Sequence, residues 1–270
     1  MLGLRLSTSQ GFSPRKAEGI AVPVKQCLAC GLIFSDPQPI PRDLSNHYGV
    51  PPEDYWGRLV YPPDYFTRQI DTAKRLISFT PDMAALDIGA GQGFAMKSLM
   101  TAGFDTWGLE PSEPFRQHCI DGMGIDPARL QLISLETADY PTESFDFITF
   151  GAVLEHLYDP HEGLQRAMRW LKPGGVIHVE VPSSNWLISK VVNAYFRLCG
   201  TNYVTNISPM HSPFHLYEFT LSSFCDFKVV EHWLDVCTPV HCPNALHPLA
   251  KWIMKKTGMG MQLTVFLRKS

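Results

Sequence analysis

Apolar residues in this 270-residue chain form short unbroken runs that alternate with stretches of helical spacing. The middle of the chain shows the pattern best. One run ends at Asp87, a second ends at Glu110 and a third covers Phe145–Phe150, and helix-like spacing follows each of them. A short apolar run predicts a buried strand, and apolar positions three or four residues apart predict a helix. The alternation predicts an α/β fold with a doubly wound, mostly parallel sheet.

The same pattern sets the expected elements along the chain. The expected strands, seven in all, are Met83–Asp87, Asp105–Glu110, Leu130–Leu135, Phe145–Phe150, Val176–Val181, Phe227–Trp233 and Gln262–Arg268. The expected helices are Asp64–Phe79, Ala95–Met100, Pro111–Ile120, His161–Leu171, Trp186–Leu198 and Pro248–Lys256, with a turn at Lys172–Gly175.

The beginning of the chain has a different character, and we expect two parts: an extension over residues 1–60 and the α/β domain over residues 61–270. Residues 1–23 are polar with Gly and Pro, which predicts no regular structure there. Cys27 and Cys30 then form a C-x-x-C turn, a spacing that directs two thiolates at one metal ion. Because a structural zinc needs four ligands and no second C-x-x-C exists, we predict no bound metal.

Composition narrows the class of protein. A net charge of −3 without a long basic run argues against a nucleic-acid binder. No apolar run reaches the roughly 18 residues of a membrane-spanning helix, and the first residues are too polar for a signal peptide. Seven scattered cysteines fit reduced thiols better than a disulfide framework. These features predict a cytoplasmic protein without membrane insertion.

The strand ending at Asp87 is followed by Gly89, Gly91 and Gly93. Glycines let a ligand approach the backbone, and the start of the following helix offers unpaired N–H donors. The G-x-G-x-G spacing differs from the G-x-G-x-x-G of dinucleotide-binding turns. Glu110 lies 21 residues beyond Gly89, a distance that suits an acid binding two ribose hydroxyls. Together they favour a nucleoside with an amino-acid tail.

Four stretches carry a family resemblance: Met83–Phe94, Asp105–Glu110, Ser144–Pro160 and Leu171–Pro182. In order and spacing they resemble motifs of the class I S-adenosylmethionine-dependent methyltransferases, in particular bacterial ones with an N-terminal C-x-x-C turn. The resemblance implies the methyltransferase activity and S-adenosylmethionine as the cofactor. The cofactor-binding residues it implies are Asp87, Gly89, Ala90, Gly91, Gly93, Glu110, Pro111, Phe150, Gly151 and Ala152.

Two further features of this family are not fixed by the residues. The position of the family's acid that binds the adenine amine is occupied here by Ser134 or Glu136, depending on how the loop is aligned. The helix Asp64–Phe79, with its aromatic residues, either covers the cofactor pocket or only packs on the sheet.

The connection from Phe224 to Phe227 is too short for the family's usual crossover helix.

The acceptor side is expected after the fifth strand. The polar and aromatic loop Thr201–Thr220 resembles that of methyltransferases acting on sugars and surface glycans, which predicts O-methylation of a sugar or glycan hydroxyl. Imidazole titrates near neutrality, so His156, His211 and His215 are the candidate bases. Glu155-His156 resembles part of a metal-binding motif of ubiquinone-pathway O-methyltransferases, but Ala152 replaces its preceding acid, so we expect no metal there.

Other functions stay open at this point. The acceptor could be a phenolic or another small metabolite, and the chain could be a paralogue that binds S-adenosylmethionine without catalysis. An NAD-dependent oxidoreductase would share the strand, turn and helix, but the glycine spacing argues against it.

Overall fold

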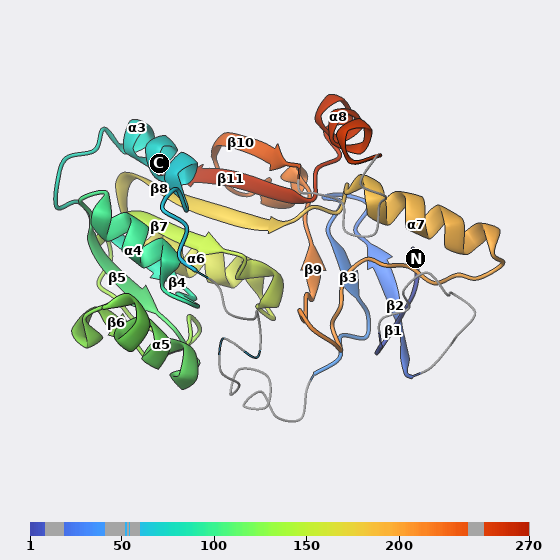
Figure 1. The fold of residues 1–270 in the computed structure, drawn as a ribbon, viewed down its shortest axis with the longest axis horizontal. Helices are drawn as coiled ribbons and strands as arrows, with labels where there is room; N and C mark the ends of the chain where they lie inside the picture. The colour runs from blue at the N-terminus through green and yellow to red at the C-terminus, as the bar shows by residue number, and fades with distance from the viewer. Residues whose placement is uncertain (9–18, 41–51, 53, 55–59, 237–245, 270) are drawn as a thin grey trace. The chain divides into compact units, whose positions relative to one another are not determined.

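The computed structural model describes residues 1–8, 19–40, 52, 54, 60–236 and 246–269 (Figure 1). Its contacts divide the chain into two compact units. Unit 1 contains Met1–Pro41, Leu154–Tyr158 and Glu180–Val265, and unit 2 contains Arg42–Val153, Asp159–Val179 and Phe266–Ser270. The predicted boundary at residue 60 is a different division of the chain and stays a prediction.

A seven-stranded sheet of the order β10-β11-β8-β7-β4-β5-β6 forms the main layer of the fold. In this sheet β5 and β6 lie on one side of β4, and β7 lies on the other side. The strand order therefore reverses at β4. The pairs β4–β5, β4–β7 and β5–β6 are parallel. The predicted doubly wound, mostly parallel α/β fold is therefore confirmed. Its strands are β4 (Ala84–Ile88), β5 (Asp105–Leu109), β6 (Leu130–Gln131), β7 (Phe145–Gly151), β8 (Leu171–Pro182), β10 (Val229–Asp235) and β11 (Gln262–Arg268).

The helices of unit 2 flank these strands in Figure 1. Leu86, Phe147 and Phe150 are fully buried, as the unbroken apolar runs predict. The helix α3 packs on β7, and α4 packs on β4 and β5. The helices of unit 2 are α3 (Thr67–Ile77), α4 (Phe94–Thr101), α5 (Glu113–Met123) and α6 (Pro160–Trp170).

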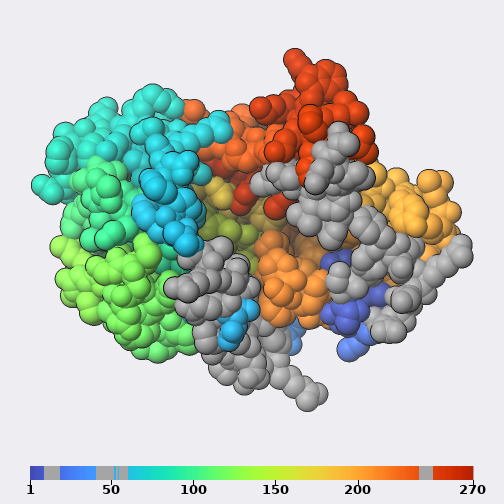
Figure 2. All heavy atoms as spheres, viewed as in Figure 1, coloured from blue at the N-terminus to red at the C-terminus, as the bar shows by residue number. Residues whose placement is uncertain are grey.

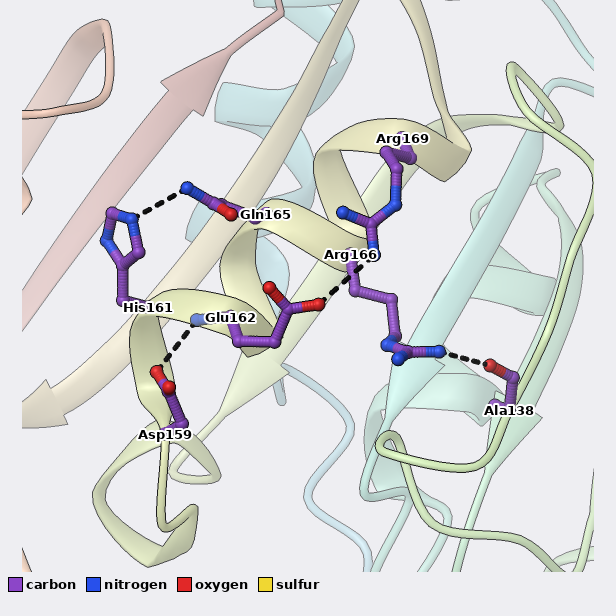
Figure 3. A network of polar contacts seen from close by, with 7 residues as sticks. All are labelled: Ala138, Asp159, His161, Glu162, Gln165, Arg166 and Arg169. Atoms are coloured by element: carbon purple, nitrogen blue, oxygen red, sulfur yellow. Dashed lines mark hydrogen bonds and ion pairs between the residues drawn. The ribbon is translucent and has the colours of Figure 1, made fainter.

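The start of α6 is specified by its own residues (Figure 3). The Asp159 carboxylate caps the helix by accepting a hydrogen bond of 2.9 Å from the Glu162 backbone N–H, and Pro160 occupies the first helical position, where no N–H is needed. Farther along, Arg166 donates to the Ala138 carbonyl at 3.1 Å. The cap and this long-range bond fix where α6 begins and which loop it supports.

Unit 1 contains a second sheet, of the order β1-β2-β3-β9. Its strands pair antiparallel, and Val24 and Ile33 of this sheet form an apolar cluster with Val204 and Ile207. The expectation that residues 1–23 lack regular structure is wrong, because β1 and the start of β2 lie there. The elements are β1 (Gly3–Leu6), β2 (Ala21–Gln26), β3 (Ile33–Ser35), β9 (Tyr217–Glu218), α7 (Leu187–Leu198) and α8 (His247–Thr257).

The C-x-x-C turn connects β2 to β3. The Cys27 N–H donates to the Leu32 carbonyl, and the Gly31 N–H donates to the Cys27 carbonyl, both at 2.9 Å. Hydroxyls of Thr220 and Ser223 donate to the Cys30 carbonyl. Among the described residues every cysteine is a free thiol, and whether Cys27 and Cys30 bind metal stays a prediction.

Three predicted elements differ from the structure. The third strand is only Leu130–Gln131, because a 3₁₀ turn with a proline precedes it and Ser134 starts a turn. The predicted turn Lys172–Gly175 belongs to the long strand β8. Instead of a crossover helix, the 3₁₀ turn η3 (Leu221–Phe224) joins β9 to β10, so the short connection fits. Two of the seven cysteines, Cys237 and Cys242, lie outside the described residues.

No helix in the described ranges combines the length and the apolar character that a membrane crossing requires. The predicted cytoplasmic location stays a prediction.

The cap of α6 gives a first testable prediction. Asp159→Ala removes the acceptor of the Glu162 N–H and should lower the free energy of unfolding by about 1 kcal/mol. Arg169→Ala removes only an exposed ion pair to Glu162 and should change it by less than about 0.5 kcal/mol. Urea unfolding of both variants measures the difference, and equal losses would contradict the importance of the cap.

Candidate functional site

The glycine turn after β4 requires glycine. Gly89, Gly91 and Gly93 have φ angles of 71°, 55° and 78°, which side chains rarely adopt. A Cβ on Gly89 would lie 2.7 Å from Cγ2 of Val153. The turn is closed by the N–H groups of Gly89 and Ala90, which both donate to the Leu109 carbonyl at 2.9 Å. Backbone hydrogen bonds therefore hold the turn between β4 and α4 in a tight conformation.

Glu110 connects this turn to the next helix. One carboxylate oxygen accepts from the Gly91 N–H and the other accepts from the Ser112 N–H, each at 2.8 Å. Ser112 in turn is the N-cap of α5. Each carboxylate oxygen has a second lone pair for a ligand hydroxyl. The acid is therefore held in place by the backbone at the point where the sequence predicts ribose binding.

Asp87 and Glu110 are two buried acids, exposed by 3% and 5%. Burial and, to a smaller extent, the neighbouring Glu110 together raise the pKa of Asp87 to about 8. Burial also raises the pKa of Glu110 to about 7. Oδ2 of Asp87 has no hydrogen-bond partner among the described residues. Such a pair favours a ligand that brings positive charge and hydroxyl groups.

Aromatic residues cover the first turn of α4. The rings of Tyr61 and Tyr65 contact the Phe94 ring edge to face, with centroids 5.5 and 5.6 Å apart. The Tyr61 hydroxyl hydrogen-bonds the Ser98 hydroxyl at 2.8 Å. Phe94 is the first residue after Gly93, so the segment before α3 packs beside the glycine turn.

The other predicted cofactor residues lie at the ends of neighbouring strands. Ala90 is buried in the turn and Pro111 is exposed after β5. Phe150 is buried in β7, Gly151 ends that strand, and Ala152 adopts a left-handed φ of 57°. In parallel strands these carboxyl ends share one edge of the sheet, the edge at which α/β folds bind ligands. Their role in cofactor binding stays a prediction.

Unit 1 holds a second cluster of titratable groups, formed by Glu155, His156 and His215. One ligand atom from each lies within 4.8 Å of the others. The His156 and His215 ring centroids are 5.1 Å apart, and Nε2 of His215 is 3.8 Å from Oε1 of Glu155. The Leu216 N–H donates to the Glu155 carbonyl at 2.8 Å, which fixes the two segments together. Glu155 and His156 belong to η2 (Leu154–His156).

Two members of this cluster, Glu155 and His215, are uncharged near pH 7. Burial raises the pKa of Glu155 to about 8, and nearby Glu180 raises it too. Burial and, to a smaller extent, His156 together lower the pKa of His215 to about 3. The acid thus keeps its proton and the imidazole stays unprotonated, so the contact between them is not an ion pair. A neutral imidazole is able to accept a proton.

His211 is not part of the cluster. Its Nε2 lies 2.9 Å from the Arg5 guanidinium, and burial and Arg5 lower its pKa to about 4. The structure thus brings together two of the three predicted bases and separates the third. The prediction did not include Glu155 as an acid-base residue. The adjacent Glu155-His156 pair was the available signal, but we interpreted it only in terms of metal binding.

Comparison with known proteins identifies the central segment. Residues 86–179 match a family model described as a methyltransferase domain. The central segment is a class I methyltransferase domain. The predicted class I S-adenosylmethionine-dependent methyltransferase domain is confirmed at this level, together with S-adenosylmethionine as its cofactor. The C-x-x-C type and the glycan acceptor are not part of this result.

The relatives support the same domain. A ubiquinone biosynthesis O-methyltransferase from Methylococcus capsulatus is 28% identical over 130 residues, which are 46% of this chain and 52% of that protein. The protein of that name from Proteus mirabilis is 30% identical over 130 residues, covering 46% and 50%. The matches thus span about half the length of these relatives.

Solved structures share the fold. The YcgJ protein from Bacillus subtilis has a TM-score of 0.51 at 16% identity, covering 76% of this chain and 98% of its own. An S-adenosylmethionine dependent methyltransferase from Mesorhizobium loti has a TM-score of 0.52 at 12% identity, covering 75% and 97%.

The buried acids of the methyltransferase domain predict a pH effect. In the unfolded chain a carboxyl ionises near pH 4, whereas Asp87 in the folded chain has a pKa of about 8. The folded state therefore keeps a proton that the unfolded state loses, and its stability falls as the pH rises from about 4 to about 8. Relative to Asp87→Asn, the wild type should lose up to about 1.4 kcal/mol per pH unit in this range. Urea unfolding of both proteins from pH 5 to pH 8 measures this change in the free energy of unfolding. A difference between wild type and Asp87→Asn that stays constant over this range would exclude a buried neutral acid at Asp87.

Proposed function

We propose that the whole chain is an S-adenosylmethionine-dependent O-methyltransferase. The observation that carries the proposal is Glu110, a buried acid that joins the glycine turn to the start of α5. Bound S-adenosylmethionine supplies a methyl group on a sulfonium, which is already a good leaving group. The protein has to bind the cofactor, orient an acceptor and receive its proton.

The chemistry of the site fits this cofactor. S-adenosylmethionine carries an ammonium, a sulfonium and two ribose hydroxyls. The free lone pairs of Glu110 suit the hydroxyls, and the positive charges would favour ionisation of Asp87 and Glu110. The glycine turn would hold the methionine part by its backbone, since a Cβ at Gly89 has no room.

Proton transfer is assigned to the cluster in unit 1. A hydroxyl becomes a good nucleophile only when a base takes its proton, and neutral His215 has the required protonation state. In this step the O–H proton of the acceptor passes to the imidazole of His215, whose Nε2 lies 3.8 Å from Oε1 of Glu155. His156 packs against the same imidazole ring. Along the chain this cluster begins four residues after the end of β7.

The acceptor is proposed to be a hydroxyl of a sugar or glycan. The polar loop Thr201–Thr220, from which His215 comes, supports this proposal by its resemblance to glycan-directed enzymes. A phenol is the second candidate, because the relatives reported above are named ubiquinone biosynthesis O-methyltransferases. A paralogue that binds S-adenosylmethionine without catalysis is a third.

Cofactor binding is tested at Glu110. Glu110→Gln keeps the size of the side chain but lacks one carboxylate oxygen and the charge. We expect a loss of about 1.5–3 kcal/mol in S-adenosylmethionine binding, or roughly tenfold or more in Kd. Glu113→Gln, an exposed position in the first turn of α5, is the matched control. Calorimetry that gives the same Kd for wild type and Glu110→Gln would reject the assignment.

Catalysis is tested at the histidines. His215→Ala should lower turnover by about 10²–10⁴-fold without changing S-adenosylmethionine affinity. His211→Ala should retain turnover, since its imidazole contacts Arg5 rather than Glu155. S-adenosylhomocysteine release with a panel of sugars, glycans and catechols measures both variants and identifies the acceptor class. Release with catechols alone would reject the sugar, and no release with S-adenosylmethionine bound would favour the non-catalytic paralogue.

Metal removal separates a proton-transfer role from a metal role. Glu155, His156 and His215 could also hold a divalent ion, since a carboxylate and two imidazoles are suitable ligands. We propose that they act in proton transfer, so EDTA should leave turnover unchanged. Loss with EDTA that Mn²⁺ or Zn²⁺ restores would assign a metal site instead.

A further inference from the structure

Unit 1 contains a cleft whose lining does not include Glu155, His156 or His215. Its volume is about 470 Å³, within the range of small-molecule sites. Its lining includes residues of the helix α7, of β10 and of β11. Polar lining residues are Gln26, Ser183, Ser184, Asn185, Asn193, Asn206, Thr220 and His232, in addition to Lys190 and Arg197.

The charged residues of the cleft are cationic. Lys190, Asn193 and Arg197 follow at intervals of three and four along α7, so they lie on one side of the helix. The lining contains no Asp or Glu, although the chain as a whole has a net charge of −3. No carboxylate among the described residues forms an ion pair with Lys190 or Arg197, which instead contact the Asn185 side-chain oxygen and, at 3.5 Å, the Leu2 carbonyl. The cleft therefore favours an anion.

The two cations are separated along the helix. Seven residues at 1.5 Å each place their Cα atoms about 10 Å apart along the axis. A ligand that reaches from one to the other is longer than a simple anion. Figure 2 shows α7 (yellow-orange) at the surface of the molecule, where such a ligand would have access.

The middle of the cleft is a fixed wall of amides. Buried Glu218 accepts from the Asn206 side-chain amide at 2.6 Å and from the Ile207 N–H at 2.9 Å. Asn206 must then turn its oxygen to the Asn193 amide, at 2.7 Å. The Asn193 oxygen accepts from the Thr205 N–H and hydroxyl. Each amide donates one of its two hydrogens in this network, so a second N–H remains for hydroxyl groups of a ligand.

Apolar side chains complete the lining. Leu2, Ile33, Leu234 and Leu263 provide a hydrophobic surface next to the amides. A sugar ring presents C–H groups on its faces and hydroxyls at its edges, which matches this combination. The cations match a phosphate.

We propose that this cleft binds a phosphorylated sugar. The phosphate lies at Lys190 or Arg197, and the ring hydroxyls lie along Asn193 and Asn206. The proposal is independent of the proposed methyl transfer, because binding to the cleft is measured without S-adenosylmethionine.

Calorimetry on the full chain tests it with glucose 6-phosphate, glucose and inorganic phosphate as probes. We expect glucose 6-phosphate to bind at least tenfold more tightly than either of the others. Lys190→Met and Arg197→Met keep the helix but remove a charge, and at least one of them should weaken binding about tenfold or more. Lys255→Met, an exposed lysine of α8 outside the cleft, should bind like the wild type.

Several results would overturn the proposal. If inorganic phosphate binds as tightly as glucose 6-phosphate, the cleft recognises only an anion. If glucose binds as tightly as glucose 6-phosphate, the cations do not contribute to binding. Binding unchanged in both methionine variants would locate the ligand elsewhere. The S-adenosylmethionine Kd of the same variants is measured in parallel, so that failure of the cofactor site is distinguished from failure of the cleft.

Discussion

The buried carboxyl of Glu110 is the interaction on which the methyltransferase domain depends most. It bonds the Gly91 N–H in the turn after β4 and the Ser112 N–H at the start of α5. Two loops that follow neighbouring parallel strands are thereby held in one arrangement. The position costs energy, since burial raises the pKa of both Glu110 and Asp87. A stable fold would not need two buried acids here, whereas a cationic nucleoside ligand would.

Unit 1 uses a buried carboxyl in a similar way. Glu218 is buried, and burial raises its pKa, while Asn206 and Ile207 donate hydrogen bonds to its oxygens. Through Asn206 it sets the orientation of Asn193 and hence the wall of the cleft. Both sites therefore consist of polar groups that the backbone and buried acids hold in place before any ligand binds, which lowers the entropy lost on binding.

An uncharged His215 beside a protonated Glu155 gives the cluster in unit 1 its chemical character. Burial lowers the pKa of His215 and raises that of Glu155, so neither group carries charge near pH 7. His211 resembles His215 in sequence, but its contact with Arg5 gives it a different partner. Both residues are histidines, so the neighbours of each imidazole, and not the residue type, distinguish the proposed base His215 from His211.

Local signals in the sequence determined the elements of the parallel sheet. The apolar runs gave β4, β5 and β7, and the helical spacing gave α4 and α6, because each depends on residues within one turn or strand. The glycine turn and Glu110 were also readable, since both lie at fixed places after their strands. Sequence alone thus led to the fold, the domain family and the candidate cofactor residues.

Contacts between distant segments were decided only by the tertiary structure. β2 and β3 pair, and their Val24 and Ile33 pack with Val204 and Ile207, whereas polar residues around them conceal that pattern in the sequence. Glu155 meets His215 across sixty residues of chain, and the cleft collects side chains from six segments. Pairings of this kind depend on packing between elements, which no local periodicity encodes.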